Sequence, residues 1–238
     1  MTLAKNWASV ARHCLSWSKM VSHRIWETQS PLRQFLSTSS KQLPPDAIAR
    51  LEKVDMPFER LYDLNSAELG EMIRLPKLGR TMHRYLHSIP KCEVNVQVYP
   101  ITRHILKLDV EITADFLWDR RFHRGAGETF QLWVEDCDSE YILHHEKVVV
   151  KEHHCADASG NPGQDIVLSV TVPITDSPLP PQYFLRLLSD TWLHSETVLP
   201  ISFKKLILPA KFLPCTELLD LQRLPFNSLD RREYAQMF

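Results

Sequence analysis

Two pairs of adjacent histidines and one acidic run are the groups in this sequence that could bind a metal or move protons. The pairs are His144–His145 and His153–His154, and the acidic run spans residues 135–140. Adjacent side chains on a strand point to opposite faces, so neither pair is expected to chelate one ion. The acidic run lacks the spacing of an EF-hand loop, and a solvated turn is the simpler interpretation. We therefore predict no bound metal.

Motifs for nucleotide hydrolysis and acyl transfer are missing from the sequence. It contains no GxxxxGK[ST] phosphate loop, no GxGxxG and no GxSxG. The first two supply backbone amides that hold phosphates, and the third positions a nucleophilic serine. The chain is therefore expected to have no catalytic residue and no cofactor of its own.

Basic residues mark two places where a polyanion could bind. Lysine and arginine neutralise phosphates, polar side chains donate hydrogen bonds to them, and an aromatic ring stacks on a base. The RNA-contact candidates are Lys19, Arg24, Trp26, Ser30, Arg33 and Gln34, and the hairpin candidates are Lys77, Arg80 and Arg84. A core tryptophan beside a solvated basic face explains the first set equally well. A packing or protein-contact role is the alternative for the second.

The charges are divided unevenly along the 238 residues, although the formal net charge is only −1. Residues 1–90 hold 13 basic and 8 acidic residues, whereas the remainder holds 15 and 21. Such asymmetry favours a polyanion near the N-terminal part. The five cysteines are scattered without a CxxC pair, which is typical of a reducing compartment. No apolar run approaches the roughly 18 residues of a membrane span, and no signal peptide is recognisable.

Helical periodicity dominates the first 90 residues. Apolar residues recur at helical spacing over 7–27, and shorter helices are expected over 31–35, with Ser30 as the N-cap, and from Pro45. Asn65 and the glutamate three residues later form a capping arrangement.

A helix-hairpin-helix is expected in the last part of this region. Residues 75–79 predict a tight turn in which a proline stops the first helix and Gly79 adopts positive φ. A second helix then follows over 80–90. Backbone amides of such a hairpin, with a flanking basic residue, can hold a phosphate.

The period changes to two after Pro90, which indicates strands. Seven are expected, and together they predict an antiparallel sandwich. They cover residues 94–98, 105–112, 130–135, 141–151, 166–172, 182–189 and 197–203. A loop over 153–164 and a proline-containing extended tail after residue 206 complete the chain.

Three sets of residues carry a resemblance to a known family. The sets are residues 30–35; 57–65 continuing through 75–79; and, near the end, 181–184, 189–193, 206–209 and 216–221. In this order they resemble the Sec-sixty-three homology unit of the large two-cassette RNA helicases. Within that family, the sequence is most similar to the N-terminal cassette of the U5 snRNP branch.

The resemblance implies an α+β multidomain fold: a helical bundle plus helix-hairpin-helix, followed by an all-β immunoglobulin-like (fibronectin type III-like) sandwich. The expected boundaries are 1–54 for a partial bundle, 55–90 for the hairpin, 91–205 for the sandwich and 206–238 for a tail or linker. The ATPase motors of the family are absent from the sequence, so the chain looks like a piece of a larger protein. The loop after residue 151 looks longer than in the family, and Arg223 stands where relatives tend to have proline.

The resemblance also implies a non-catalytic accessory and scaffold role in a nuclear, spliceosomal RNA helicase. The expected partners are single-stranded or duplex U4/U6 snRNA, the RecA-like and winged-helix domains of the same helicase, and the large U5 scaffold protein, without a membrane. ATP and Mg belong to the missing motors. The alternatives are the same unit of the activating-signal cointegrator helicase, and a protein-binding adaptor that never contacts RNA.

Overall fold

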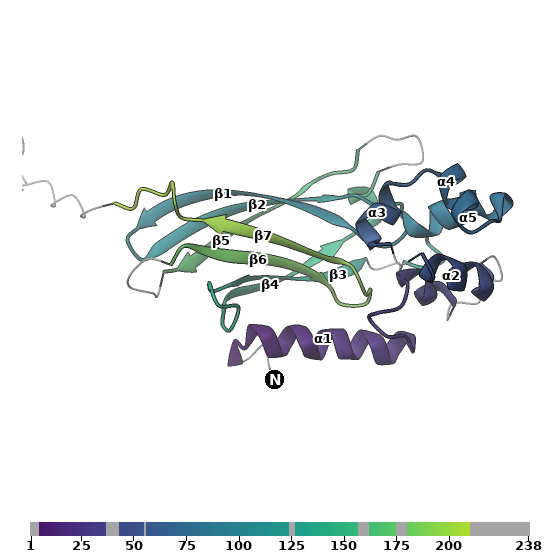
Figure 1. The fold of residues 1–238 in the computed structure, drawn as a ribbon. Helices are drawn as coiled ribbons and strands as arrows, with labels where there is room; N and C mark the ends of the chain where they lie inside the picture. The colour runs from purple at the N-terminus through teal and green to yellow at the C-terminus, as the bar shows by residue number, and fades with distance from the viewer. Residues whose placement is uncertain are drawn as a thin grey trace, which may run out of the picture. The chain divides into compact units, whose positions relative to one another are not determined.

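The computed structural model describes residues 5–36, 43–54, 56–123, 127–156, 162–174 and 180–209 (Figure 1). These residues form an α+β protein with helices and two antiparallel sheets. Among the described residues, no helix is long and apolar enough to cross a membrane. The expected tail beyond residue 209 lies outside the described residues.

The first part of the chain is helical, as its periodicity predicts. Its helices are α1 (Ala8–His23), the 3₁₀ helix η2 (Pro31–Leu36), α2 (Pro45–Glu52), α3 (Phe58–Asp63), α4 (Ser66–Met72) and α5 (Pro76–Leu86). α1 ends where Arg24 adopts a left-handed conformation with φ of 56°. The Ser30 hydroxyl is buried without a hydrogen-bond partner, so its predicted role as a side-chain N-cap of η2 is wrong. The capping box of Asn65 and Glu68 at the start of α4 is confirmed.

The connection between α4 and α5 corrects the predicted turn. Pro76 begins α5 instead of ending a helix, because a proline at the first helical position loses no intrahelical hydrogen bond. The positive φ belongs to Arg74, at 56°, and Gly79 lies inside α5. A Cβ on Gly79 would overlap the Ser66 carbonyl oxygen and lie 3.1 Å from the Gly70 Cα. Gly79 therefore permits close packing of α4 against α5.

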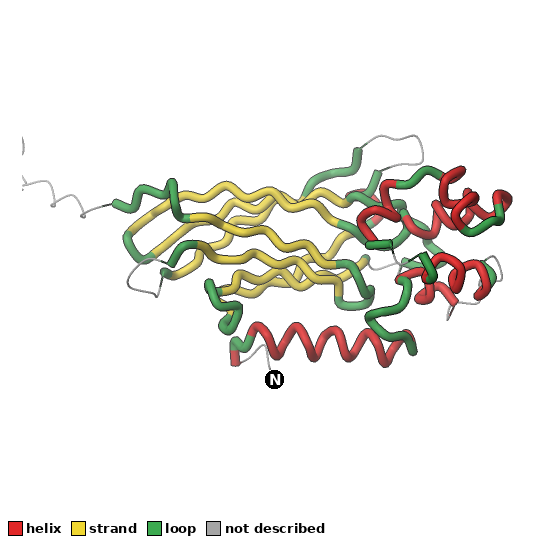
Figure 2. Tube along the Cα trace, in the orientation of Figure 1, coloured by secondary structure: helices red, strands yellow, loops and turns green. Residues whose placement is uncertain are grey.

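The seven expected strands are confirmed and form two sheets (Figure 2). They are β1 (Cys92–Thr102), β2 (Ile105–Ala114), β3 (Glu128–Glu135), β4 (Ile142–Val150), β5 (Ile166–Pro173), β6 (Gln182–Ser189) and β7 (Glu196–Ser202). The sheet orders are β1-β2-β5 and β4-β3-β6-β7, and every pairing is antiparallel. In β2 the alternating residues Leu106, Leu108 and Val110 are buried, as a half-buried strand requires. The expected loop after β4 begins with the short 3₁₀ helix η3 (Glu152–His154).

Apolar side chains gather in three clusters. The largest draws residues from both sheets, which therefore pack face to face. A second cluster lies among α2, α4, α5 and η2 and also contains Trp192, from the β6–β7 connection. The third joins Ala8 and Ala11 of α1 to Trp133 and Leu188 of the four-stranded sheet. Helices and sheets consequently share buried surface, and α1 lies along the four-stranded sheet (Figure 1).

Candidate nucleic-acid interface

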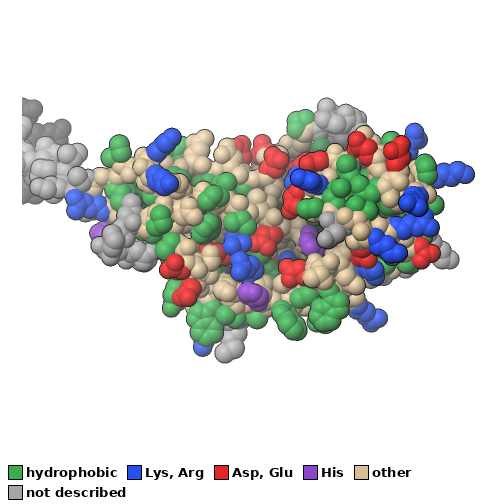
Figure 3. Space-filling model, viewed as in Figure 1, with side chains coloured by type: hydrophobic (Ala, Val, Ile, Leu, Met, Phe, Trp, Pro, Cys, Tyr) green, Lys and Arg blue, Asp and Glu red, His purple; other side chains and the backbone are tan. Residues whose placement is uncertain are grey.

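Four basic side chains surround the α4–α5 turn. α5 supplies Lys77 and Arg80, the turn supplies Arg74, and Arg50 reaches from α2 to donate a hydrogen bond to the Ile73 carbonyl at 3.1 Å. All four are exposed, and none forms an ion pair within the described part of the chain. We call these four residues the hairpin cluster. Lysine and arginine side chains gather over this helical end in Figure 3.

The start of α5 adds to the positive potential of the hairpin cluster. Its N-cap, Leu75, makes no side-chain capping bond, and its first turn contains no acidic residue. The N-terminus of a helix carries partial positive charge, which here is left unneutralised. Lys77 and Arg80 are three residues apart and therefore neighbours on the helix surface. This arrangement suits phosphate groups.

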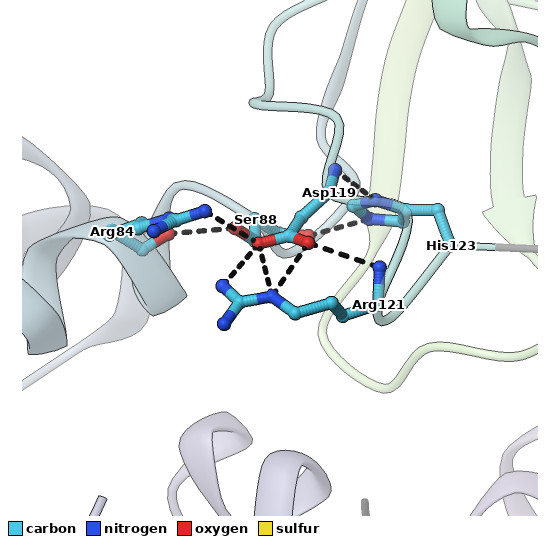
Figure 4. A network of polar contacts seen from close by, with 5 residues as sticks. All are labelled: Arg84, Ser88, Asp119, Arg121 and His123. Carbon is cyan, nitrogen blue, oxygen red and sulfur yellow. Dashed lines mark hydrogen bonds and ion pairs between the residues drawn. The ribbon is translucent and has the colours of Figure 1, made fainter. Parts of the chain in front are cut away.

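The structure places the third hairpin candidate elsewhere. Arg84 lies two turns after Lys77, roughly 10 Å farther along the helix axis. Its guanidinium is 3.0 Å from the Asp119 carboxylate, which Arg121 also binds at 2.6 Å (Figure 4). The hydrogen bond from Arg121 lowers the pKa of Asp119 to about 2. Arg84 thus joins α5 to the β2–β3 connection and is not part of the hairpin cluster.

His123 lies in the same network and links the helices to the sandwich. The Asp119 amide donates to Nδ1 at 2.8 Å, and Nε2 lies 2.9 Å from the Ser88 carbonyl oxygen (Figure 4). Nδ1 must accept and Nε2 must donate, which defines the neutral imidazole. Only 3% of His123 is exposed. Burial therefore lowers its pKa by disfavouring the charged form.

We expect the stability of the protein to fall between pH 7.5 and 5.5 because of His123. Its pKa is lower in the folded chain, so the unfolded chain binds more protons as pH falls through its ordinary value of about 6.5. The loss at pH 5.5 is at most about 1.4 kcal/mol for one histidine. Urea unfolding at both pH values measures it, and His123→Gln should reduce the difference. An equal difference in the variant would contradict this assignment.

Two of the RNA-contact candidates are exposed at the end of α1. Arg24 follows the helix, and Trp26 is 65% exposed. Both line an apolar hollow of about 290 Å³. Its lining residues are Trp17, Met20, Val21, Arg24, Ile25 and Trp26. An exposed indole beside a guanidinium is able to stack on a base and contact a phosphate.

The remaining RNA-contact candidates make contacts within the protein. The Arg33 guanidinium binds the Glu52 carboxylate through Nε at 2.6 Å and Nη2 at 2.7 Å. The Gln34 side chain accepts from the Leu193 amide at 2.9 Å and donates to the Leu193 carbonyl at 3.2 Å. The Ser30 amide donates to Glu52 at 3.0 Å, and Lys19 is only 6% exposed. RNA contact by these four stays a prediction.

Sequence reasoning missed Arg50 and Arg74 of the hairpin cluster. Arg74 was not recognisable because a non-glycine residue with positive φ has no reliable sequence signal. Arg50 is brought to the turn by a contact between helices that are distant in sequence. The only sequence signal for Arg50 was its position as a basic residue on the polar face of the helix that begins at Pro45.

The acidic residues considered above for metal binding form hydrogen bonds within the protein. Glu135 is buried and accepts hydrogen bonds from Trp133 at 2.7 Å and Arg186 at 2.8 Å. The Asp136 carboxylate accepts the amide of Glu140 at 2.8 Å and so closes the β3–β4 turn. Within the described ranges, no group of three histidine, cysteine or acidic residues is arranged to hold a metal ion.

Comparison with known proteins assigns the family. Residues 1–202 match the Sec63 Brl domain, and the chain therefore belongs to the Sec63 family. Over its full length it is 45% identical to the U5 small nuclear ribonucleoprotein 200 kDa helicase of Homo sapiens. It is 46% identical to the DExH-box ATP-dependent RNA helicase DExH12 of Arabidopsis thaliana and 38% identical to the pre-mRNA-splicing factor brr2 of Schizosaccharomyces pombe. The chain covers 10% of the length of each of these relatives.

Proposed function

We propose that this chain is a non-catalytic accessory and scaffold unit of a nuclear, spliceosomal RNA helicase that unwinds U4/U6 RNA. Similarity over the whole of this chain to a U5 small nuclear ribonucleoprotein helicase and to a pre-mRNA-splicing factor supports this assignment. The proposal assigns ATP and Mg to motor domains that lie outside the chain. The splicing relative is favoured over the activating-signal cointegrator helicase, because two of the three relatives compared above are named for splicing or the U5 particle.

The proposal includes a division of the chain into a partial helical bundle, a helix-hairpin-helix and an immunoglobulin-like sandwich. α4 and α5 around Arg74 supply the hairpin. The sheet orders β1-β2-β5 and β4-β3-β6-β7 support a fibronectin type III-like sandwich, with β4 on the four-stranded sheet. The sandwich would dock the RecA-like and winged-helix domains and the large U5 scaffold protein.

The hairpin cluster carries the RNA part of the proposal. Its four exposed cations form no ion pair with another described residue, so phosphates can be bound there without first breaking an ion pair. Arg24 and Trp26 would provide a second contact through a phosphate and a stacked base. Arg33 and Gln34 would support this contact indirectly, because their bonds to Glu52 and Leu193 hold η2, the helix that follows Trp26 in the chain.

Replacing both Lys77 and Arg80 by glutamine is expected to weaken RNA binding and its salt dependence. Each phosphate contact to single-stranded RNA contributes about 0.7 to the slope of log affinity against log salt, so the double variant should lose about 1.4. Fluorescence anisotropy with a labelled single-stranded RNA across a salt series measures the slope. The matched control replaces the exposed Lys204 and Lys205, which follow β7, by glutamine.

The outcome also tests the protein-binding alternative. The Lys204 and Lys205 control should keep the wild-type slope, because these lysines lie outside the hairpin cluster. If binding depended only on total charge, the control and the Lys77 and Arg80 double variant would lose the same slope. If the chain binds RNA with the same slope in all three proteins, the hairpin cluster is not the RNA site. If no salt-dependent binding occurs, the adaptor function without RNA contact is favoured.

A further inference from the structure

The helix α1 presents its larger apolar side chains to solvent. Exposed apolar residues and one cysteine recur along it at alternating intervals of three and four residues, and we call this set the outer stripe: Trp7, Val10, Cys14, Trp17 and Val21. Trp17 is 62% exposed and Val21 is 73% exposed. Apolar side chains stand along the edge of the molecule where α1 lies (Figure 3). This spacing is the heptad pattern through which two helices pack together.

The inner face of α1 is the weaker of its two apolar faces. It contacts the four-stranded sheet through Ala8, Ala11 and Leu15, and one turn later it carries Lys19. An alanine buries little surface, whereas one large aromatic side chain buries about 150–250 Å². A helix whose only partner is this sheet would have its large apolar side chains on the inner face. The composition of α1 is therefore that of a helix with a second apolar partner.

The outer stripe continues into the apolar hollow of about 290 Å³ at the end of α1. Trp17 and Val21 belong both to the stripe and to the lining of this hollow. When helices pack, a side chain of one inserts between side chains of the other. A cavity of about 150 Å³ holds benzene, so this hollow is large enough for a leucine or phenylalanine side chain. The hollow therefore suits one anchoring residue of a partner helix.

The charges beside the outer stripe are positive. Residues 8–23 contain no aspartate or glutamate. At the start of the stripe, the Lys5 Nζ lies 4.8 Å from the centroid of the Trp7 ring, and at its end Arg24 lines the hollow. The acidic residues next to the helix are Glu27, which follows it, and Glu140, whose carbonyl accepts a hydrogen bond from its first residue. Neither of them lines the hollow.

From the heptad spacing, the hollow and the positive charges, we propose that the outer stripe binds an amphipathic helix of a protein partner. One face of that helix carries large apolar residues at heptad spacing, and acidic residues border this face. The two helices pair along the length of α1, which is about 24 Å for its 16 residues. The acidic side chains of the partner then lie near Lys5 and Arg24.

Charge and residue type argue against two other occupants. A second copy of the chain would bring like charges together, because antiparallel α1 helices place Lys5 opposite Arg24 and parallel ones place each opposite itself. Single-stranded RNA would use rings and cations, but Val10 and Val21 offer it neither a stacking surface nor a hydrogen bond. The inference goes beyond the proposed function, since it stands even if the chain contacts no RNA. Both proposals use Arg24, so the test relies on Trp17 and Val21.

The probe is a labelled synthetic helix of three heptads, with leucine at the two apolar positions of each heptad and glutamate at the flanking positions. The matched peptide carries lysine instead of glutamate, and like charges oppose self-pairing in both. Fluorescence anisotropy with the full chain should give a Kd on the order of 10 μM for the acidic peptide. The lysine peptide should bind at least about tenfold more weakly, and added salt should narrow the difference.

Substitutions in the outer stripe locate the binding. The double variant Trp17→Ser, Val21→Ser should bind the acidic peptide about thirtyfold more weakly, because a few aromatic anchors dominate most interfaces. Val167→Ser, at a position on β5 that is 69% exposed, is the matched control and should keep the wild-type affinity. These side chains are exposed, so circular dichroism should show an unchanged fold. The Lys77 and Arg80 double variant should also keep the affinity, so a failure of the RNA proposal is distinguishable from a failure of this one.

Four results would overturn the proposal. The first two are no binding of the acidic peptide at about 100 μM protein, and equal binding of the acidic and lysine peptides. The third is unchanged binding of the acidic peptide to the Trp17 and Val21 double variant. The fourth is a different occupant. Dimerisation of the wild-type chain in sedimentation that is lost in this variant would assign the stripe to a second copy, and loss of RNA binding in this variant without any peptide binding would assign it to RNA.

Discussion

Replacing Gly79 by alanine is expected to destabilise the protein by about 3 kcal/mol and to disrupt the hairpin. The added Cβ would overlap the Ser66 carbonyl oxygen and lie 3.0 Å from the Gly70 nitrogen. These are backbone atoms, which cannot turn away as a flexible side chain can. α4 and α5 would have to separate, and Met82 and Leu86 of α5 would lose part of their buried contacts. Urea unfolding followed by circular dichroism measures the change.

Arg80→Ala is the matched control for this variant. Arg80 is the next residue of α5 and is exposed, so the change should leave the free energy of unfolding within about 0.5 kcal/mol of wild type. Both variants should bind RNA more weakly, one through lost structure and the other through lost charge. If Gly79→Ala is as stable as Arg80→Ala, the close approach of α4 and α5 is not essential.

Local patterns predicted the sandwich well because each strand has one buried face. Leu106 and Leu108 are about 1% exposed, whereas Lys107 between them reaches solvent. This alternation is set by strand geometry and needs no knowledge of the partner strand. The capping box at Asn65 is local in the same sense. Both features were therefore available from the sequence.

The hairpin shows where local patterns fail. A proline followed by a glycine three residues later occurs both in turns and in the first turn of a helix. Which of the two forms at positions 76 and 79 depends on how closely α4 approaches α5, which is a tertiary contact. The turn was therefore placed a few residues late, and Arg74 was overlooked. Lys77 and Arg80 were still identified, because their charge and spacing do not depend on that choice.

The contacts of the other candidates depend on residues far along the chain. Gln34 binds the backbone of Leu193, which is 159 residues away, and Arg84 binds Asp119 across 35 residues. Basic and polar residue types indicated polyanion binding, but the same types also join separate parts of a fold. Lys19 lies on the inner face of α1, and only the packing of that helix on the sheet shows this. Residue type shows which side chains could bind a polyanion, whereas their positions in the fold determine which of them are free to do so.

Replacing Trp192 by alanine is expected to cost about 4 kcal/mol, mainly through loss of contact between the helices and the sandwich. The residue lies between β6 and β7 but packs in the apolar cluster formed by α2, α4, α5 and η2. The centroid of its ring is 5.3 Å from that of Phe35 and 5.8 Å from that of His123. Its indole also donates a hydrogen bond to the buried Glu128 at 3.2 Å. The sandwich core does not include Trp192, so that core should survive its loss.

The elements in which amide hydrogen exchange accelerates show whether Trp192 links the helices to the sandwich or belongs to one common core. In Trp192→Ala, amide hydrogen exchange should accelerate in η2 and α5 and remain slow in β2 and β3, because the helices lose a shared contact that the sandwich core does not need. Trp192→Phe keeps an aromatic ring and loses the hydrogen bond, so it should cost about 1 kcal/mol and preserve the wild-type pattern. Uniform acceleration in Trp192→Ala would mean that the whole unit unfolds together. Selective acceleration would mean that one aromatic contact from the β6–β7 connection holds the helices of the hairpin cluster in place, and that the proposed RNA binding depends on this packing against the sandwich.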